Sequence, residues 1–279
     1  MIRLGHIDYS NCFPVHAMLI AQQPPPDVHI LTGVPAVLNR ALAAGEIDVA
    51  PCSSIEYARH SAEYRVLPDF VIGSDGPVQS IRFDARIDPA SLHGRTVHVT
   101  DSSATSVVLL RVLLERYWGV TADFVTFDQT SADPLQLGAD AALFIGDVAL
   151  RRPTDAAPFV YDLGAVWREW TGLPFAFAVW QARRDMDDAD LRRLDDLLHA
   201  SRDWFNRHRR DLADRYAPSF QVDPRRLLHY WESLRYDMDD RMRNGLQRFL
   251  QLAAEIGAAP PVPRIAFAPT ERNPQASGE

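Results

Sequence analysis

The clearest absence in the sequence is lysine. The 279 residues include 29 that are Lys or Arg, and every one of them is arginine. Enzymes that form a Schiff base with a substrate or with pyridoxal phosphate need a lysine amine. The phosphate-binding loop of P-loop nucleotide-binding proteins contains a lysine as well. The sequence therefore excludes these mechanisms.

Cysteines and long apolar runs are also scarce. Cys12 and Cys52 are the only cysteines, which is too few for a disulfide framework and typical of a reducing cytoplasm. An apolar run such as residues 173–180 is far shorter than the roughly 20 residues that span a bilayer. Residues 1–6 lead directly into a strand-like pattern, without the apolar core of a signal peptide. We therefore expect a cytoplasmic protein with no membrane partner.

The charge balance argues against a nucleic-acid partner. The formal net charge is −8 and the isoelectric point is about 5.6, whereas nucleic-acid binding needs a basic face. A local cluster of arginines lies in a helical stretch that also contains Asp203, Asp211 and Asp214. This pattern predicts a solvated helix face, formed by Arg207, Arg209 and Arg210.

Several signature motifs are missing too. The sequence has no G-x-S-x-G elbow, so a hydrolase of that design is unsupported. It has no G-x-G-x-x-G, which removes the main dinucleotide signal. His6, Cys12 and His16 lie close together, but their spacings of six and four positions match no common zinc pattern. We therefore expect no metal site there.

What the sequence does contain is an alternation of strand and helix patterns. This alternation predicts a mostly parallel sheet with helices on its faces, and it occurs twice before the chain turns helical beyond Asp185. The chain would cross between the two halves near residues 76–83 and 175–181. We therefore expect two lobes with a ligand cleft between them: residues 1–80 and 176–279 in lobe 1, and residues 81–175 in lobe 2.

The C-terminal stretch predicts little structure. From Ala258 onward it is rich in proline and has few apolar residues after Phe267. We expect it to form a frayed tail.

Three polar loops follow strand patterns and precede helix patterns. In open α/β sheets, ligands bind beyond the carboxyl ends of the strands, where the N-termini of helices converge. Free N–H groups and small hydroxyl side chains at such places can hold an anion, or they can simply cap the helix. With no lysine in the chain, three such loops on one cleft favour a carboxylate ligand. The loops are residues 8–11, 52–54 and 102–106.

Two further positions are weaker candidates. Ser80 ends the segment 76–80 at the first crossing strand and could face the cleft. Gly146 and Asp147 follow a buried strand pattern, and Asp147 could line the cleft. The alternative, that Asp147 caps the next turn, is the more common use of such a residue.

A series of short motifs recurs in unbroken order over residues 2–256. The most specific are GHIDYSNCFP at residues 5–14 and WTGLPF at residues 170–175. The others are GVP at 33–35, GEIDVA at 45–50, SSIEY at 53–57, GPVQS at 76–80, SATS at 103–106, IGD at 145–147 and YDLGAVW at 161–167. In this order they resemble the chorismate dehydratases of menaquinone biosynthesis (MqnA). A sister family, the dihydroxynaphthoate synthases, has a different N-terminal motif that the sequence does not match.

The resemblance implies a fold and a reaction. The fold would be a two-lobed α/β fold like that of the type 2 periplasmic binding proteins, without a signal peptide. The reaction would be the dehydration of chorismate to 3-[(1-carboxyvinyl)oxy]benzoate, the first step of the futalosine route to menaquinone. The resemblance implies no cofactor and no metal.

The resemblance also assigns roles to residues. Asn11 and Ser80 match the family's functional positions, yet neither a carboxamide nor a neutral hydroxyl can hold the abstracted proton. Our hypothesis is that the enolpyruvyl carboxylate of the substrate takes it; in a competing version, Asp147 is the base. The substrate-binding positions would be Ser53, Ser54, Ser103, Thr105, Ser106, Gly146 and Asp147.

Other readings of the residues stay open. The same fold would serve a non-catalytic cytoplasmic binding protein for a small aromatic or cyclic carboxylate, or a lyase like the dihydroxynaphthoate synthases. The sequence is compatible with a monomer or a homodimer.

Overall fold

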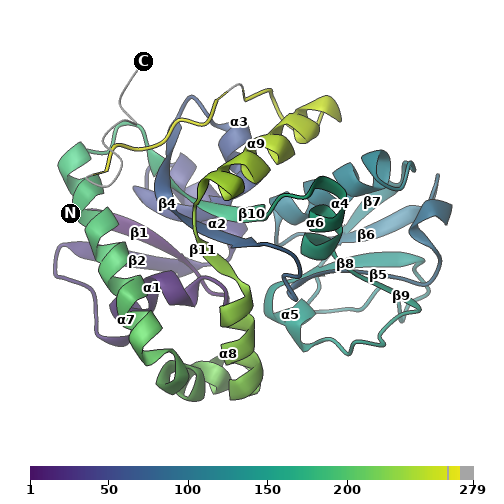
Figure 1. Cartoon of the computed structure of the whole chain (residues 1–279), viewed down its shortest axis with the longest axis horizontal. Helices are drawn as coiled ribbons and strands as arrows, with labels where there is room; N and C mark the ends of the chain where they lie inside the picture. Colours follow the sequence, from purple (N-terminus) through teal and green to yellow (C-terminus); the bar gives the residue numbers. More distant parts are fainter. Residues whose placement is uncertain (263, 271–279) are drawn as a thin grey trace.

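The computed structural model describes residues 1–262 and 264–270, and it contains two β-sheets that lie next to each other (Figure 1). The strands of the six-stranded sheet run in the order β11-β4-β10-β3-β1-β2, and those of the five-stranded sheet in the order β7-β6-β8-β5-β9. The first sheet consists of β1 (Ile2–Ile7), β2 (Val28–Gly33), β3 (Val49–Ser53), β4 (Tyr64–Ser74), β10 (Phe175–Arg183) and β11 (Arg235–Asp237). The second consists of β5 (Ile81–Ala85), β6 (Thr96–Thr100), β7 (Asp123–Phe127), β8 (Ala141–Ile145) and β9 (Phe159–Asp162).

The two sheets share one pattern. In each, three neighbouring strands are parallel: β2, β1 and β3 in the first sheet, and β7, β6 and β8 in the second. The next strand in each sheet is antiparallel, and it directly follows a crossing of the chain: β10 in the first sheet and β5 in the second. Each sheet with its helices forms one lobe, called here the six-stranded lobe and the five-stranded lobe.

The helices follow the strands as the sequence predicts. Helix α4, for example, begins after Ser103, whose side chain accepts a hydrogen bond from the backbone N–H of Ser106, and it buries an apolar stripe. The helices are α1 (Phe13–Ala21), α2 (Pro35–Ala43), α3 (Ser54–Arg59), α4 (Ala104–Arg116), α5 (Gly146–Arg151), α6 (Leu163–Thr171), α7 (Asp188–Phe220), α8 (Pro224–Ser233) and α9 (Asp240–Glu255), with a 3₁₀ turn η1 (Pro89–Ser91).

The C-terminal segment differs from the expected frayed tail over the part that the structure describes. Phe267 pairs with Val66 of β4, and the backbone of Ala266 and Ala268 exchanges hydrogen bonds with Val66. Ala268 is fully buried. The expectation was wrong here because the segment pairs with the free edge of β4 and also buries Val262 and Ile265 in the core. Residues 263 and 271–279 lie outside the described residues.

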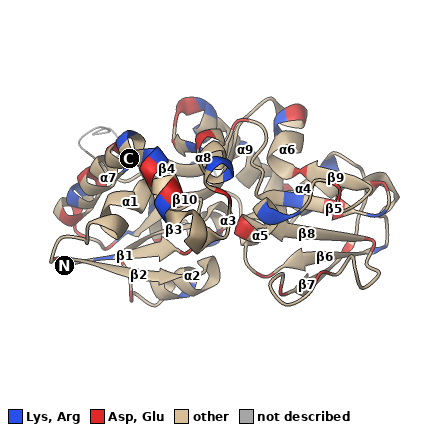
Figure 2. Ribbon diagram, turned by 90° about the horizontal axis from the view of Figure 1, so that it is seen from below, with Lys and Arg blue, Asp and Glu red and all other residues tan. Residues whose placement is uncertain are grey.

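Helix α7 runs along the outer side of the six-stranded lobe, where it packs against α1 (Figure 1). Figure 2 shows acidic and basic residues side by side on this helix. The arginine cluster predicted to be solvated is exposed, which confirms that prediction; it consists of Arg207, Arg209 and Arg210. Among the described residues, none of the helices combines the length and the apolar character needed to cross a bilayer.

Candidate active site

The loop that carries Asn11 connects β1 to α1 and lies against the five-stranded lobe. The Ser10 hydroxyl donates a hydrogen bond to Oδ1 of Asp147, and the Ser10 backbone N–H donates to Oδ2 at 3.3 Å. On the other side, the indole of Trp231 on α8 donates to the Ser10 carbonyl at 2.7 Å. Asn11 is half-buried next to this anchored residue.

Ser80 ends the first crossing segment, and the half-buried carboxylate of Asp162 holds the turn that precedes it. Asp162 accepts hydrogen bonds from the backbone N–H groups of Val78 and Gln79, at 2.9 and 2.6 Å, and from that of Ala165 at the start of α6. Gln79 has a φ of 65°, which is unfavourable for a residue with a side chain, so the turn needs this support. Burial raises the pKa of Asp162, while its backbone donors act in the opposite direction.

Ser80 contacts a buried phenol from the C-terminal helices. Tyr230 on α8 is fully buried, and its hydroxyl donates a hydrogen bond of 2.6 Å to Oγ of Ser80. Trp231, the next residue of α8, holds the carbonyl of Ser10 beside Asn11. The structure thus brings two segments that carry Asn11 and Ser80, which lie 69 positions apart in the chain, against one helix.

Gly146 and Asp147 begin α5 directly opposite this loop. The Gly146 backbone N–H donates to the Ser80 carbonyl at 2.8 Å, which ties α5 to the crossing segment. Burial raises the pKa of Asp147, and the two hydrogen bonds from Ser10 partly offset that shift. Asp147 therefore lies between the lobes instead of only capping its own helix.

The other candidate hydroxyls lie at a second contact between the lobes. The backbone N–H of Ile55 on α3 donates to the Thr105 hydroxyl on α4 at 3.2 Å, so the starts of these helices face each other. The Ser54 hydroxyl donates to the carbonyl of Ala176, and Ser53 is buried next to it.

Ser103 and Ser106 bond to each other at the start of α4. Their hydroxyl oxygens are 2.9 Å apart, and Ser103 accepts from the backbone N–H of Ser106. With the lobes in contact, these side chains cap α4, which is the structural role that the sequence left open for them.

His6, Cys12 and His16 form a buried cluster beside the loop of Asn11. Their ligand atoms all lie within 4.8 Å of one another. However, the Trp180 indole donates to Nε2 of His16, so the proton of the neutral ring is on Nδ1, the atom that would face a metal. The Nδ1 atoms of His16 and His6 are 3.0 Å apart, so the Nδ1–H of His16 can donate to His6. The cluster is best described as a buried hydrogen-bond chain.

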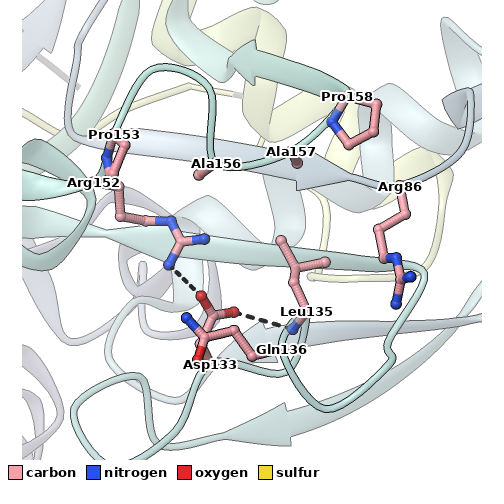
Figure 3. A pocket seen from close by; sticks show the side chains of 9 residues that line it. All are labelled: Arg86, Asp133, Leu135, Gln136, Arg152, Pro153, Ala156, Ala157 and Pro158. Atoms are coloured by element: carbon pink, nitrogen blue, oxygen red, sulfur yellow. Dashed lines mark hydrogen bonds and ion pairs between the residues drawn. The ribbon is translucent and has the colours of Figure 1, made fainter.

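A cavity of about 370 Å³ lies in the five-stranded lobe (Figure 3). Arg152 points into it, bonds to Asp84 and Asp133 at 2.9 Å each, and stacks on Phe144. Both oxygens of Asp133 are engaged, since the Leu135 backbone N–H donates to the other one. Its lining contains none of the predicted site residues: Arg86, Asp133, Leu135, Gln136, Arg152, Pro153, Ala156, Ala157 and Pro158.

Sequence reasoning missed Tyr230 and Trp231, which hold the two candidate loops. Both lie in a stretch that reads as a packing helix, and no local pattern marks them as site residues. Asp162 belongs to one of the quoted motifs, but that motif alone does not indicate its contacts with the segment before Ser80.

Comparison with known proteins bears on both fold and family. The chain is 31% identical to a chorismate dehydratase of Thermus thermophilus, over 89% of this chain and 93% of that protein. It is 32% identical to a chorismate dehydratase of Campylobacter jejuni over 62% of this chain and 64% of that one. It is 26% identical to a 1,4-dihydroxy-6-naphtoate synthase of Thermus thermophilus, over 95% and 98% of the two chains.

Solved structures show the fold. A crystal structure of an Archaeoglobus fulgidus protein matches with a TM-score of 0.76 at 20% identity, over 92% of this chain and 97% of that one. The periplasmic aliphatic sulphonate binding protein of Escherichia coli matches with a TM-score of 0.65 at 15% identity, over 95% and 94%. The expected periplasmic-binding-protein-like fold is thereby confirmed. A family model described as menaquinone biosynthesis matches residues 2–255, so the chain belongs to the menaquinone biosynthesis family.

Proposed function

We propose that this protein is a chorismate dehydratase, which converts chorismate to 3-[(1-carboxyvinyl)oxy]benzoate in menaquinone biosynthesis. The observation that carries the proposal is that one helix, α8, holds both Ser80 and the loop of Asn11, in a chain 31% identical to a chorismate dehydratase. Both side chains are neutral and polar, which suits a site that orients a substrate and leaves proton abstraction to another group.

The reaction is an elimination of water that creates an aromatic ring. A base removes the ring hydrogen on the carbon that bears the enolpyruvyl ether. The electron pair of that C–H bond enters the ring as the C–O bond to the neighbouring hydroxyl breaks. The departing hydroxide takes up the abstracted proton and leaves as water. Aromatisation supplies the driving force, so no oxidant is involved. The protein has to provide a base, a hydrogen-bond donor for the leaving hydroxyl, and shielding from bulk water.

The enolpyruvyl carboxylate of chorismate takes the proton in the proposed mechanism. Asn11 binds the leaving hydroxyl, and Ser80 orients the enolpyruvyl group by donating a hydrogen bond to it. This assignment gives each neutral side chain a role that it can perform, because neither has to accept a proton from carbon.

The carboxylates of the substrate are held where the helices begin. In the proposed complex, Ser103, Thr105 and Ser106 bind one carboxylate at the start of α4, while Ser53 and Ser54 contribute from the six-stranded lobe. Since Ile55 and Thr105 contact each other directly, the substrate enters when the lobes move apart. We place the lobe boundaries near residues 80 and 176.

Asp147 is the alternative base. Its raised pKa would suit proton abstraction, but both of its oxygens accept hydrogen bonds from Ser10, which favours a role in holding the lobes together. Asp147→Asn should therefore keep turnover within about tenfold of the wild type. Loss of turnover with near-normal chorismate binding would instead make Asp147 the base.

The competing function is a non-catalytic receptor for a small cyclic carboxylate, since the fold is shared with periplasmic binding proteins. The fate of the ligand separates the two. Purified protein is mixed with chorismate, and the mixture is followed by ultraviolet absorbance. An aromatic spectrum that grows with time supports the dehydratase, whereas binding without spectral change supports the receptor.

A further inference from the structure

Helix α8 supplies a buried phenol that contacts the candidate catalytic residue Ser80. Tyr230 lies 150 positions after Ser80, and both side chains are fully buried. The phenol donates to Ser80 at 2.6 Å, which is a short hydrogen bond between neutral hydroxyls.

The direction of this hydrogen bond determines what Ser80 can do. Burial raises the pKa of Tyr230 far above its usual value, so the phenol keeps its proton and stays a donor. A serine oxygen that accepts from a phenol retains its own hydrogen, which can be donated to a third group. The Ser80 carbonyl is held by the Gly146 backbone N–H, so the residue has little freedom to turn away.

Asn11 lies on the other loop that α8 holds. Its Oδ1 atom is buried and has no hydrogen-bond partner in the described part of the chain. A buried acceptor of this kind is costly unless a ligand supplies a donor, as a polar group of a bound substrate would.

The neighbours of Tyr230 on α8 hold the same two loops. Trp231 donates to the Ser10 carbonyl at 2.7 Å, and Ser233 accepts from the Gln79 side chain at 2.9 Å. One helix thus fixes the residue before Asn11 and the residue before Ser80.

We propose that Tyr230 is a positioning residue, which aligns the Ser80 hydroxyl toward the substrate. The proposal rests on the proposed dehydration of chorismate. In it, Tyr230 donates to Ser80, and Ser80 donates to the enolpyruvyl group. Tyr230 itself does not touch the reacting atoms.

Tyr230→Phe tests this role, because it removes the hydroxyl and keeps the ring. We expect kcat to fall about tenfold with little change in KM, since the lost hydrogen bond orients the reacting groups more than it binds substrate. Tyr236→Phe is the matched control: its hydroxyl is buried and has no hydrogen-bond partner among the described residues, so kcat should stay at the wild-type value.

A double-mutant cycle with Ser80→Ala separates positioning from general structural damage. If Tyr230 acts through Ser80, Tyr230→Phe should have almost no further effect on kcat in the Ser80→Ala background. Equal losses in both backgrounds, or wild-type kcat in Tyr230→Phe, would overturn the proposal. If the wild type failed to convert chorismate, the proposed function would fail separately. In that case the free energies of unfolding of the wild type, the two single variants and the double variant would still measure the coupling between Tyr230 and Ser80. Strictly additive free energies would overturn this coupling as well.

Discussion

At the scale of residues, the most unusual environment belongs to two buried histidines beside the candidate active site. Burial lowers the pKa of His6 to about 4 and that of His16 well below its usual range. Both rings are neutral and joined in a chain that ends at the Trp180 indole. This hydrogen-bond chain forms only while both rings are neutral. A ring that takes a second proton has no acceptor nitrogen left for the hydrogen bond, and its charge would be buried.

This environment predicts a pH-dependent stability. The unfolded chain binds a proton at His6 near pH 6.5, and the folded protein does so only near pH 4. The free energy of unfolding should therefore fall as the pH drops through this window, by about 1.4 kcal/mol for His6 at pH 5.5. His6→Gln should reduce the loss between pH 7.5 and 5.5, measured by urea unfolding. His29→Gln, on an exposed position of β2, should retain the full loss; an unchanged loss in His6→Gln would contradict this account.

At the scale of elements, the turn before Ser80 and the start of α6 share one carboxylate. Asp162→Ala should lower the free energy of unfolding by about 1–3 kcal/mol, because it removes the helix cap and leaves buried N–H groups without a partner. Turnover should fall as well, since the turn that presents Ser80 loses its support.

A serine at the same position separates these two effects. Asp162→Ser can still cap α6, but it is too short to reach both Val78 and Gln79. We expect its thermal stability to recover partly while kcat stays low. Full recovery of both properties would show that the turn does not depend on Asp162.

A glycine in α9 marks the closest approach between that helix and the chain before β10. A Cβ atom on Gly245 would lie 2.0 Å from the Pro174 carbonyl oxygen. Gly245→Ala should destabilise the protein by roughly 1–3 kcal/mol in chemical denaturation, although alanine is the better helix former. Asn244→Ala, on the exposed side of the same helix, should leave stability near the wild-type value.

Some elements can be predicted from local sequence patterns, and others cannot. The helices that follow polar loops are predictable because local signals mark their starts, such as Pro14 for α1 and Ser103 for α4. Strand β4 is not predictable in this way. Pro68 and Asp69 interrupt its apolar pattern, although the strand lies inside the sheet. The strand tolerates the proline at an irregularity in its pairing with β10. What makes it a strand is long-range pairing.

At the scale of the whole molecule, several contacts join the lobes, and two of them involve the predicted site loops or their neighbours. Ser10 bonds to Asp147, and the Ile55 backbone bonds to Thr105. The three polar loops could be placed at the carboxyl ends of strands from sequence alone. Tyr230 could not, because only the folded chain brings α8 to residues far earlier in the sequence.

The contact between Ser10 and Asp147 predicts a shift in lobe closure. Ser10→Ala removes a hydrogen bond to a buried carboxylate, so more of the ligand-free protein should have separated lobes and chorismate should bind about tenfold more weakly. Small-angle X-ray scattering should give a larger radius of gyration for Ser10→Ala without ligand, converging on the wild type at saturating chorismate. Ser91→Ala, exposed on η1, is the control. Identical radii for Ser10→Ala and the wild type would contradict the role of this contact.

The measurement that tests the central claim most directly is the single-turnover rate of Asn11→Ala with chorismate. It is measured in chelator-treated buffer, with the product identified by mass and the fold checked by circular dichroism. Losing one hydrogen bond to a developing charge costs about 1.5–3 kcal/mol, so the account predicts a rate roughly 10–150-fold below the wild type, with chorismate bound in both proteins and the mass of one water lost in the product. A wild-type rate in Asn11→Ala would contradict the assignment of the site.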